Sequence, residues 1–317
     1  MIELQRPSAV STYWGMINDQ WRNSFFRRNL DKIAKDQVVL DVGAGTGILS
    51  AYALDAGAKF VYAVEQNKQS AEMAQFLLSQ CFDQSRFKVI NCNFWSDAID
   101  QHIPKNSIDI FLSETAGPGL FDQGMIQSWE CARSLLKATA VSLPDKLHCD
   151  VHVWNLAVQF DQPRNPVQLL DEQNLLMPQF ADAIKEFLKQ EKLPPYYNVW
   201  TDLKDCAITP DKIYTDLVEV TKDTLPYIDF LQKGSVQDYM KPHIEFKLEF
   251  TEPGPKTVAI INKMSFGDDT IYLQDAPVMP WKFSPTVIIP DSGIYQFDFN
   301  TELALLSADK WIVTKVD

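Results

Sequence analysis

The sequence predicts an α/β protein, in which an N-terminal helix and a helix-covered parallel sheet precede an antiparallel, β-barrel-like domain with a helical insertion. Three observations lead to this fold class. Strand-like apolar runs alternate with helical segments up to about residue 144, a glycine-rich turn follows the first run, and polar and apolar residues alternate beyond Pro144. The 317 residues suffice for two ordinary domains, each with its own core.

The first predicted element is an amphipathic helix over residues 13–34. Apolar residues recur there every three or four positions, the spacing that places side chains on one helix face. Five apolar side chains are expected on this buried face: Trp21, Phe25, Phe26, Leu30 and Ile33. Residues 1–34 are therefore predicted to form an N-terminal helical segment.

Residues 35–144 show the alternation of strands and helices. Strands are predicted at Val38–Val42, Phe60–Val64, Phe87–Ile90 and Ile108–Leu112, and helices at Ile48–Leu54 and Ser70–Cys81. Strands that alternate with helices form a parallel sheet whose two faces are both covered. This segment is therefore predicted to be a Rossmann-like domain.

Residues 145–317 change to a pattern of period two. The stretches HCDVHVW, HIEFKLEF, TVAIINKM and IYQFDF predict an antiparallel β domain, and the family resemblance given below implies that this domain is β-barrel-like. Residues 167–192 interrupt this pattern with helical spacing that closes at Pro194, which predicts a helical insertion over about residues 165–198. Six apolar side chains of the insertion are expected to pack either on the barrel or on a second copy in a homodimer: Leu169, Leu170, Leu175, Leu176, Phe180 and Phe187.

The composition excludes several classes of protein from the prediction. A formal charge of −13 disfavours a nucleic-acid partner, because phosphate contacts need clustered Lys and Arg. No apolar run reaches the roughly 20 residues of a membrane span, and the N-terminus lacks the order of a signal peptide. The five cysteines and four histidines are scattered without metal-ligand spacing. We therefore expect a cytoplasmic protein with reduced thiols, no metal and no membrane partner.

The glycine-rich turn DVGAGTG, residues 41–47, follows the first strand and precedes a helix. A dinucleotide fingerprint would require Gly or Ala where this chain has Ile48. The spacing GxGxG, an acidic residue two positions before it and Glu65 at the end of the next strand are instead similar to class I S-adenosylmethionine methyltransferases. That resemblance implies a cofactor site, in which Glu65 accepts hydrogen bonds from the ribose hydroxyls. The predicted cofactor-binding residues of these strands and loops are Asp41, Gly43, Gly45, Gly47, Glu65, Phe94 and Trp95.

The loop SETAGPGLFDQGMI, residues 113–126, carries Glu114 directly after the fourth predicted strand. A guanidinium is planar, stays protonated, and presents paired N–H donors that suit carboxylate oxygens. Carboxylates in a dry pocket can therefore orient a substrate guanidinium and compensate its charge. The alternative is that Glu114 caps a neighbouring helix.

Five motifs together resemble the protein arginine methyltransferases, in the form seen in their monomethylating branch. They are YWGMINDQWRN, VLDVGAGTGILS, FVYAVE, SETAGPGLFDQGMI and PDKLHCDVHVW, and the resemblance covers most of residues 10–155 and a patch near residue 280. It implies that the N-terminal helix covers the cofactor and that Arg22 grips the carboxylate of the cofactor. The alternative for Arg22 is a place on an exposed helix face.

The chain departs from the family at two positions. The second glutamate of the family's double-E loop falls at Gln123, and Pro280 replaces the histidine of its Thr-His-Trp loop. An amide supplies no charge, so losing one ionic partner of a buried cation could cost a few kcal/mol. The resemblance implies two sets of residues, a catalytic set of Glu114, Gln123 and Trp281 and a substrate-binding set of Tyr13, Asp122 and Met125.

Three functions remain open at this level. The first is methylation of protein arginine, with S-adenosylmethionine as the methyl donor. The second is methylation of a small guanidino or amino compound such as free arginine, because the altered pocket carries fewer charges. The third is a cofactor-binding scaffold or regulatory protein without turnover. Cofactor binding is common to all three, so Gln123 and Pro280 are the positions that separate them.

Overall fold

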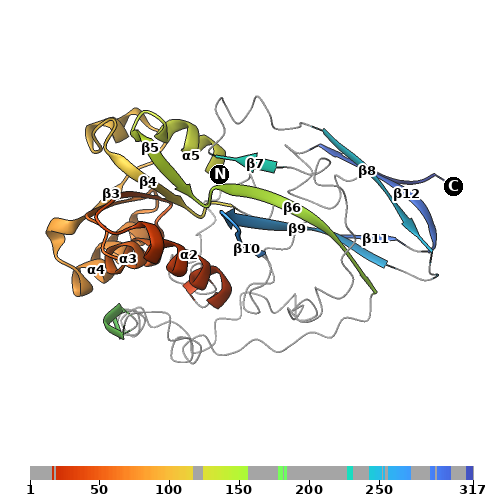
Figure 1. Ribbon diagram of the computed structural model, residues 1–317, viewed down its shortest axis with the longest axis horizontal. Coiled ribbons are helices and arrows are strands. Elements are labelled where there is room, and N and C mark those ends of the chain that lie inside the picture. The colour runs from red at the N-terminus through yellow and green to blue at the C-terminus, as the bar shows by residue number, and fades with distance from the viewer. Residues whose placement is uncertain are drawn as a thin grey trace, which may run out of the picture. The chain divides into compact units, whose positions relative to one another are not determined.

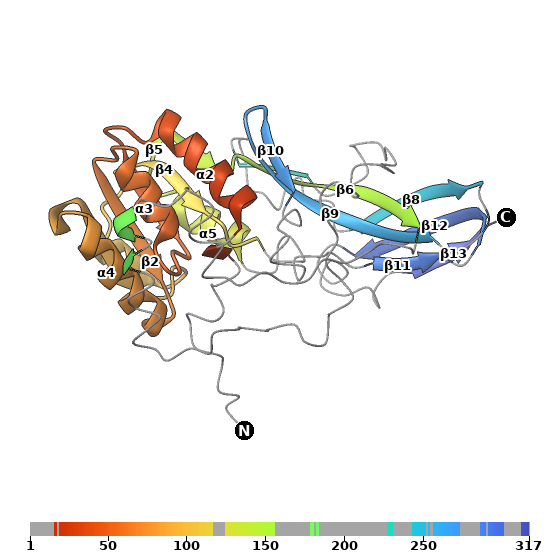
Figure 2. The same ribbon diagram turned by 90° about the horizontal axis from the view of Figure 1, so that it is seen from below.

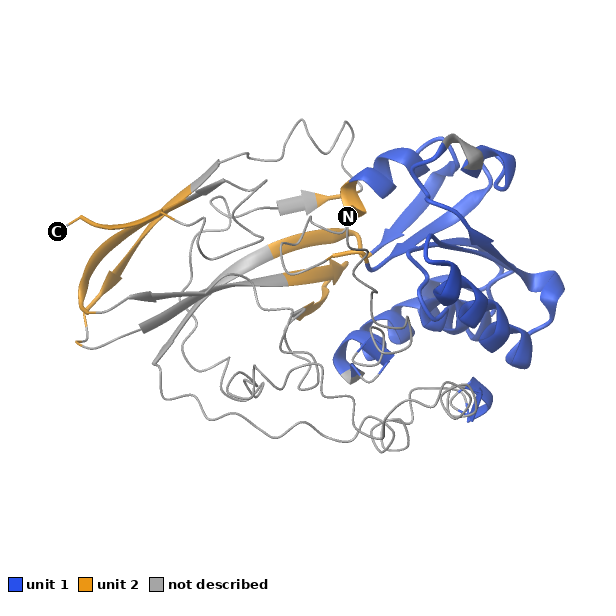
Figure 3. Ribbon diagram, turned by 180° about the vertical axis from the view of Figure 1, so that it is seen from behind, with its two compact units in different colours: residues 1–114, 127–143, 163–202 blue, residues 115–126, 144–162, 203–317 orange. Residues whose placement is uncertain are grey.

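The computed structural model divides the chain into two compact units, which are described separately (Figure 3). One unit comprises residues 1–114, 127–143 and 163–202, and the other comprises residues 115–126, 144–162 and 203–317. The structure describes residues 16–17, 19–116, 124–155, 178–180, 182–183, 227–230, 243–251, 253, 256–272, 286–289, 291–300 and 312–316. The domain boundaries inferred from the sequence remain a prediction.

The first unit contains a five-stranded parallel sheet in the order β3-β2-β1-β4-β5. Its strands are β1 (Val38–Val42), β2 (Phe60–Glu65), β3 (Phe87–Asn91), β4 (Ile108–Ser113) and β5 (Leu136–Leu143). The prediction of a parallel sheet is confirmed, although β5 was not predicted. Because β1 lies between β2 and β4, the strand order reverses beside it, and ligands bind at such a point in open α/β sheets.

One α-helix precedes β1, and further α-helices and short 3₁₀ segments connect the strands. They are α2 (Gln20–Ile33), α3 (Ile48–Asp55), α4 (Lys68–Cys81), α5 (Met125–Ala132), η1 (Gln84–Arg86) and η2 (Asp97–Gln101). Helices α2, α3 and α4 gather beside the sheet in both views (Figures 1 and 2). Helix α3 is the most apolar of them, and its residues 48–54 are all buried. The layer of helices therefore seals one face of the sheet.

Helix α2 corrects two details of the sequence prediction. Residues 16 and 17 are helical, but the helix that carries the predicted apolar face begins at Gln20. The side chain of Trp21 is 45% exposed, whereas Phe25, Phe26 and Leu30 are fully buried. Trp21 is displaced from the buried face because that face also contains three polar side chains, which hydrophobicity alone assigns to solvent: Arg22, Asn23 and Asn29.

The second unit is built from antiparallel strands, as the period-two pattern predicts. They are β6 (Lys146–Asn155), β7 (Tyr227–Asp229), β8 (His243–Phe250), β9 (Lys256–Phe266), β10 (Asp269–Tyr272), β11 (Thr286–Ile289), β12 (Gly293–Asn300) and β13 (Ile312–Lys315). One sheet has the order β10-β9-β6-β7, with β11 paired to β9, and the other has the order β13-β12-β8. The rings of Phe246 and Phe297 stack between β8 and β12 at 5.0 Å.

The predicted helical insertion is described at only two short stretches. Residues 178–180 and 182–183 are helical, and the side chain of Phe180 is fully buried. The other apolar residues named for the insertion lie outside the described residues. Among the helices that the structure describes, none is long and apolar enough to cross a membrane.

Candidate active site

The candidate site lies within the first unit, where β1, β2 and β4 end. Register pairs Val42 of β1 with Val64 of β2 on one side and with Ser113 of β4 on the other. The Ser113 hydroxyl donates a hydrogen bond to the carbonyl oxygen of Val42 at 2.9 Å. The residues that follow these strand ends are therefore brought to one edge of the sheet: the glycine loop, Glu65 and Glu114.

The glycine loop adopts a backbone conformation that requires its glycines. Gly43, Gly45 and Gly47 have φ angles of 76°, 55° and 79°, in the left-handed region that other residues avoid. Gly47 is also the N-cap of α3, and a Cβ added there would lie 3.2 Å from the Cβ of Ala74 on α4. The loop thus turns sharply and directs the N-terminus of α3 to the edge of the sheet, where a ligand can approach the backbone.

Glu65 is anchored through both of its carboxylate oxygens. Oε2 accepts from the Gly45 amide at 2.9 Å, and Oε1 accepts from the Asn67 amide at 2.7 Å. The side-chain amide of Asn91 also donates to the Glu65 carbonyl oxygen at 2.8 Å, a contact that the sequence did not indicate. A carboxylate offers about four acceptor sites, so Glu65 retains capacity for ligand hydroxyls. Its contact with the ribose hydroxyls stays a prediction.

Asp41 provides an acceptor that the protein itself leaves unused. Its Oδ2 accepts from the Ser50 hydroxyl at 2.6 Å, whereas Oδ1 is buried without a hydrogen-bond partner among the described residues. Burial raises the pKa of Asp41 to about 6, although the Ser50 hydrogen bond and the charge of Arg22 oppose the rise. A buried acceptor without a partner is costly. An N–H or O–H donor of a ligand would offset this cost, and the residues therefore fit a cofactor with such donors.

Replacing Asp41 with Asn is expected to remove a pH dependence of stability. The folded pKa lies above the unfolded value of 3.8, so stability is highest below that value and falls as the pH rises through about 6. The rise of the Asp41 pKa from 3.8 to about 6 corresponds to a loss of about 3 kcal/mol in the free energy of unfolding between low and high pH. Urea unfolding of both proteins between about pH 4 and pH 7 measures the difference in unfolding free energy. Parallel pH profiles would contradict the raised pKa.

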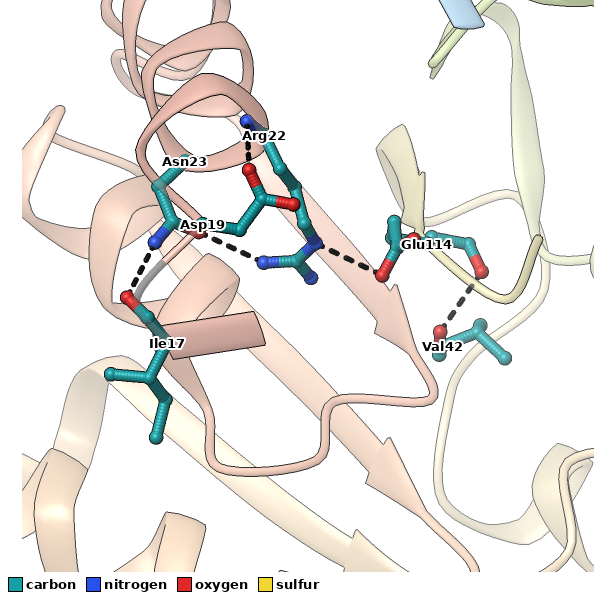
Figure 4. A network of polar contacts seen from close by, with 7 residues as sticks. Ile17, Asp19, Arg22, Asn23, Val42 and Glu114 are labelled. Carbon is teal, nitrogen blue, oxygen red and sulfur yellow. Dashed lines mark hydrogen bonds and ion pairs between the residues drawn. The ribbon is translucent and has the colours of Figure 1, made fainter. Parts of the chain in front are cut away.

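Arg22 and Glu114 form a buried ion pair between α2 and the end of β4 (Figure 4). Arg22 Nε donates to Glu114 Oε2 at 3.0 Å, and the two side chains are only 5% and 2% exposed. The sequence assigned Arg22 to the cofactor and Glu114 to a substrate cation. In the structure the two side chains pair with each other, Glu114 is buried and does not face solvent, and Arg22 does not lie on an exposed face.

Two neighbours that sequence reasoning missed hold Arg22 in place. Asp19 caps α2, and its Oδ1 accepts from the backbone amide of Arg22 at 2.9 Å. Asn23 Oδ1 accepts from Arg22 Nη1 at 2.9 Å. The guanidinium carbon also lies 5.5 Å from the centre of the Phe26 ring. The signal for Asp19 was present, since Asp is a preferred N-cap residue, but nothing local indicates that Asn23 is buried.

The remaining predicted site residues lie in different surroundings. Phe94 is buried, whereas Trp95 is 49% exposed and donates from Nε1 to the Ser128 hydroxyl at 3.1 Å. Met125, the first residue of α5, is fully buried. Residues named from the resemblance that lie outside the described residues are Tyr13, Asp122, Gln123, Pro280 and Trp281. The described residues contain no cluster of three or more side chains that could hold a metal ion.

Sequence comparison relates the chain to methyltransferases. The FtsJ-like methyltransferase family model matches residues 23–192, more than half of the chain. Protein arginine N-methyltransferase 9 of Xenopus laevis is 34% identical over 115 residues, which are 36% of this chain and 14% of that protein. Histone-arginine methyltransferase CARMER of Drosophila persimilis is 33% identical over 225 residues, which are 69% of this chain and 41% of that protein. The chain therefore spans less than half the length of these curated relatives.

Comparison with solved structures supports the fold. The structure of PRMT6-SAH aligns with a TM-score of 0.59 and 17% identity, over 96% of this chain and 98% of that chain. A likeness at this identity shows the fold alone. It confirms the predicted class, a Rossmann-like parallel sheet followed by antiparallel sheets.

Proposed function

The chain belongs to the methyltransferases and, among them, to the protein arginine methyltransferase family, and on that premise we propose that it is an S-adenosylmethionine-dependent N-methyltransferase that acts on a guanidinium. The observation that carries the proposal is the convergence of three features on one edge of the sheet. The glycine loop follows β1, and Glu65 is the last residue of β2. Glu114 follows β4 and forms the buried pair with Arg22.

The residues of this edge would divide the binding of the cofactor. Glu65 would accept from the ribose hydroxyls, the open Oδ1 of Asp41 and the glycine-loop backbone offer further polar contacts, and Arg22 supplies the positive charge for a carboxylate. When bound, S-adenosylmethionine supplies a methyl group on a positively charged sulfur. We place Phe94 and Trp95 near the adenine as in the sequence prediction.

The substrate is proposed from the chemistry of Glu114. Its carboxylate already pairs with one guanidinium in the structure, that of Arg22, in surroundings from which water is largely excluded. Such a carboxylate can orient a second guanidinium and balance its charge. Protein arginine is the first proposed substrate, because the curated relatives are named as protein or histone arginine methyltransferases. The monomethylating branch remains a prediction.

The two other readings stay as alternatives. Gln123 in place of a second glutamate would suit a substrate with fewer charge contacts, such as a small guanidino compound. The same residue and Pro280 would also suit a scaffold that binds the cofactor without turnover. A Gln123→Glu variant separates these alternatives. A partly disabled enzyme should gain activity on arginine peptides, a small-molecule enzyme should lose activity on its own substrate, and a scaffold should show none.

Replacing Glu65 with Ala tests the cofactor site. The variant is expected to raise the Kd for S-adenosylhomocysteine about tenfold to hundredfold, because hydrogen bonds to a charged group contribute about 1.5–3 kcal/mol. Titration calorimetry of both proteins measures the Kd. Glu72→Ala is the matched control, since Glu72 is an exposed residue on the next helix and should leave the Kd unchanged. An unchanged affinity in the Glu65 variant would remove the ribose assignment.

The assembly and the location of the protein are proposed from the sequence. We propose that the protein forms a homodimer, with residues 165–198 as its contact segment. Light scattering at high micromolar concentration would measure the mass of the assembly. A monomeric mass would count against the dimer. A cytoplasmic location is proposed from the dispersed cysteines, which are typical of a reducing compartment, and can be checked by fractionating cells that express the protein.

A further inference from the structure

Asn23 is a buried amide that uses both ends of its side chain. It is fully buried on α2, its Nδ2 donates to the Ile17 carbonyl oxygen at 2.7 Å, and its Oδ1 accepts from Arg22 Nη1 at 2.9 Å (Figure 4). The chemistry of the two partners fixes the orientation of the amide. A guanidinium can only donate and a carbonyl can only accept, so the oxygen must face Arg22 and the nitrogen must face Ile17.

The Arg22 guanidinium is thereby held at two of its three nitrogens. Nη1 is fixed by Asn23 and Nε by Glu114, and two contacts on a rigid plane determine its orientation. Nη2 has no hydrogen-bond partner among the residues that the structure describes. Arg22 can therefore keep its pair with Glu114 and still offer donors to an anionic group of a ligand.

We propose that Asn23 is a positioning residue for cofactor binding, which acts by holding the Arg22 guanidinium in the orientation that presents Nη2 to the carboxylate of the cofactor. The proposal rests on the proposed function. Asn23 also ties this orientation to the chain before α2 through Ile17. A donor held ready before binding loses less conformational entropy when the ligand arrives, so its loss weakens affinity without removing a direct contact.

Asn29 offers a matched control on the same helix. It is fully buried like Asn23, its Nδ2 donates to the Phe25 carbonyl oxygen at 2.9 Å, and its Oδ1 accepts from Lys32 Nζ at 3.1 Å. Phe25 and Lys32 both belong to α2 itself and not to the candidate site. Asn23→Ala and Asn29→Ala should therefore both lower the melting temperature, since each leaves buried polar groups unpaired.

Only Asn23→Ala is expected to weaken cofactor binding beyond its effect on stability. Its Kd for S-adenosylhomocysteine, measured by calorimetry well below the melting temperature, should rise about tenfold, whereas the Asn29→Ala value should stay within about twofold of the parent. Asn23→Asp keeps the acceptor for Arg22 and should retain more affinity than Asn23→Ala. Equal Kd values for the two alanine variants would overturn the proposal.

A second readout does not depend on cofactor binding. Hydrogen exchange of the Arg22 Nε–H, identified in NMR spectra by its absence in Arg22→Lys, reports how firmly the guanidinium is held. Exchange should be faster in Asn23→Ala and unchanged in Asn29→Ala. If the parent protein binds no S-adenosylhomocysteine, the proposed function fails, and this exchange rate alone decides the positioning role. Unchanged exchange in Asn23→Ala would overturn that role.

Discussion

Replacing Glu114 with Gln is expected to reduce methyl transfer at least about hundredfold, a loss of about 2.7 kcal/mol of transition-state stabilisation. The change keeps the shape of the side chain and removes its charge. Position 123 already carries an amide, so the variant would have no carboxylate at either motif position. It would also leave the buried guanidinium of Arg22 without its ionic partner. A methyl-transfer assay with labelled cofactor, at several substrate concentrations, measures kcat and KM.

The control for this variant is the same chemical change at an exposed ion pair. Glu72 pairs with Lys68 at 3.8 Å on α4, with its side chain 66% exposed, and Glu72→Gln should leave turnover within about twofold. Calorimetry with S-adenosylhomocysteine separates a loss of cofactor affinity from a loss of turnover. If Glu114→Gln methylates its substrate as fast as the parent, the carboxylate does not hold the substrate.

Replacing Arg22 with Met is expected to destabilise the unliganded protein by about 3–5 kcal/mol, because it removes the opposite charge that lies 3.0 Å from the buried Glu114 carboxylate. The double variant Arg22→Met with Glu114→Gln removes both charges and should regain most of this loss. Chemical denaturation of the parent, the two single variants and the double variant gives the coupling energy of the pair. A double variant whose loss equals the sum of the single losses would contradict the coupling.

Arg133 and Glu130 provide the matched control for the ion pair. Their charged groups lie 3.1 Å apart, close to the distance in the buried pair, but their side chains are 47% and 27% exposed. Exposed pairs contribute about 0–1 kcal/mol, so Arg133→Met should cost far less than Arg22→Met. Equal losses at the two sites would show that burial does not decide the cost.

The parallel sheet could be predicted because its signals are local. The runs at Val38–Val42 and Phe60–Val64 are apolar except for Asp41, and the glycine loop lies between strand and helix, so each element is visible in a short window. Strand β5 was missed because its residues 138 and 139 are exposed and its burial pattern is mixed. Antiparallel strands such as β8 were predicted because apolar and polar residues alternate along them. The burial of Phe246, Leu248 and Phe250 follows that alternation.

The arrangement of the site could be predicted only in part. Glu65 and Asp41 were predicted because one closes the second strand and the other directly precedes the glycine loop, an arrangement similar to class I S-adenosylmethionine methyltransferases. The pairing of Arg22 with Glu114 joins residues 92 positions apart, and no local pattern reports such a contact. The prediction that Trp21 lies on the buried face of α2 was wrong for the same reason. Buried polar side chains such as Asn23 are stabilised by partners that only the folded chain brings near.

One measurement tests most directly whether this chain transfers a methyl group to a guanidinium nitrogen. The protein is incubated with isotope-labelled S-adenosylmethionine and three acceptors, which are an arginine peptide, the same peptide with lysine in place of arginine, and free arginine. Fragmentation mass spectrometry then locates the label. The account predicts label on a guanidinium nitrogen of the arginine peptide or of free arginine, none on the lysine peptide, and none with Glu114→Gln. Cofactor binding without label on any guanidinium, or label on the lysine peptide alone, would contradict it.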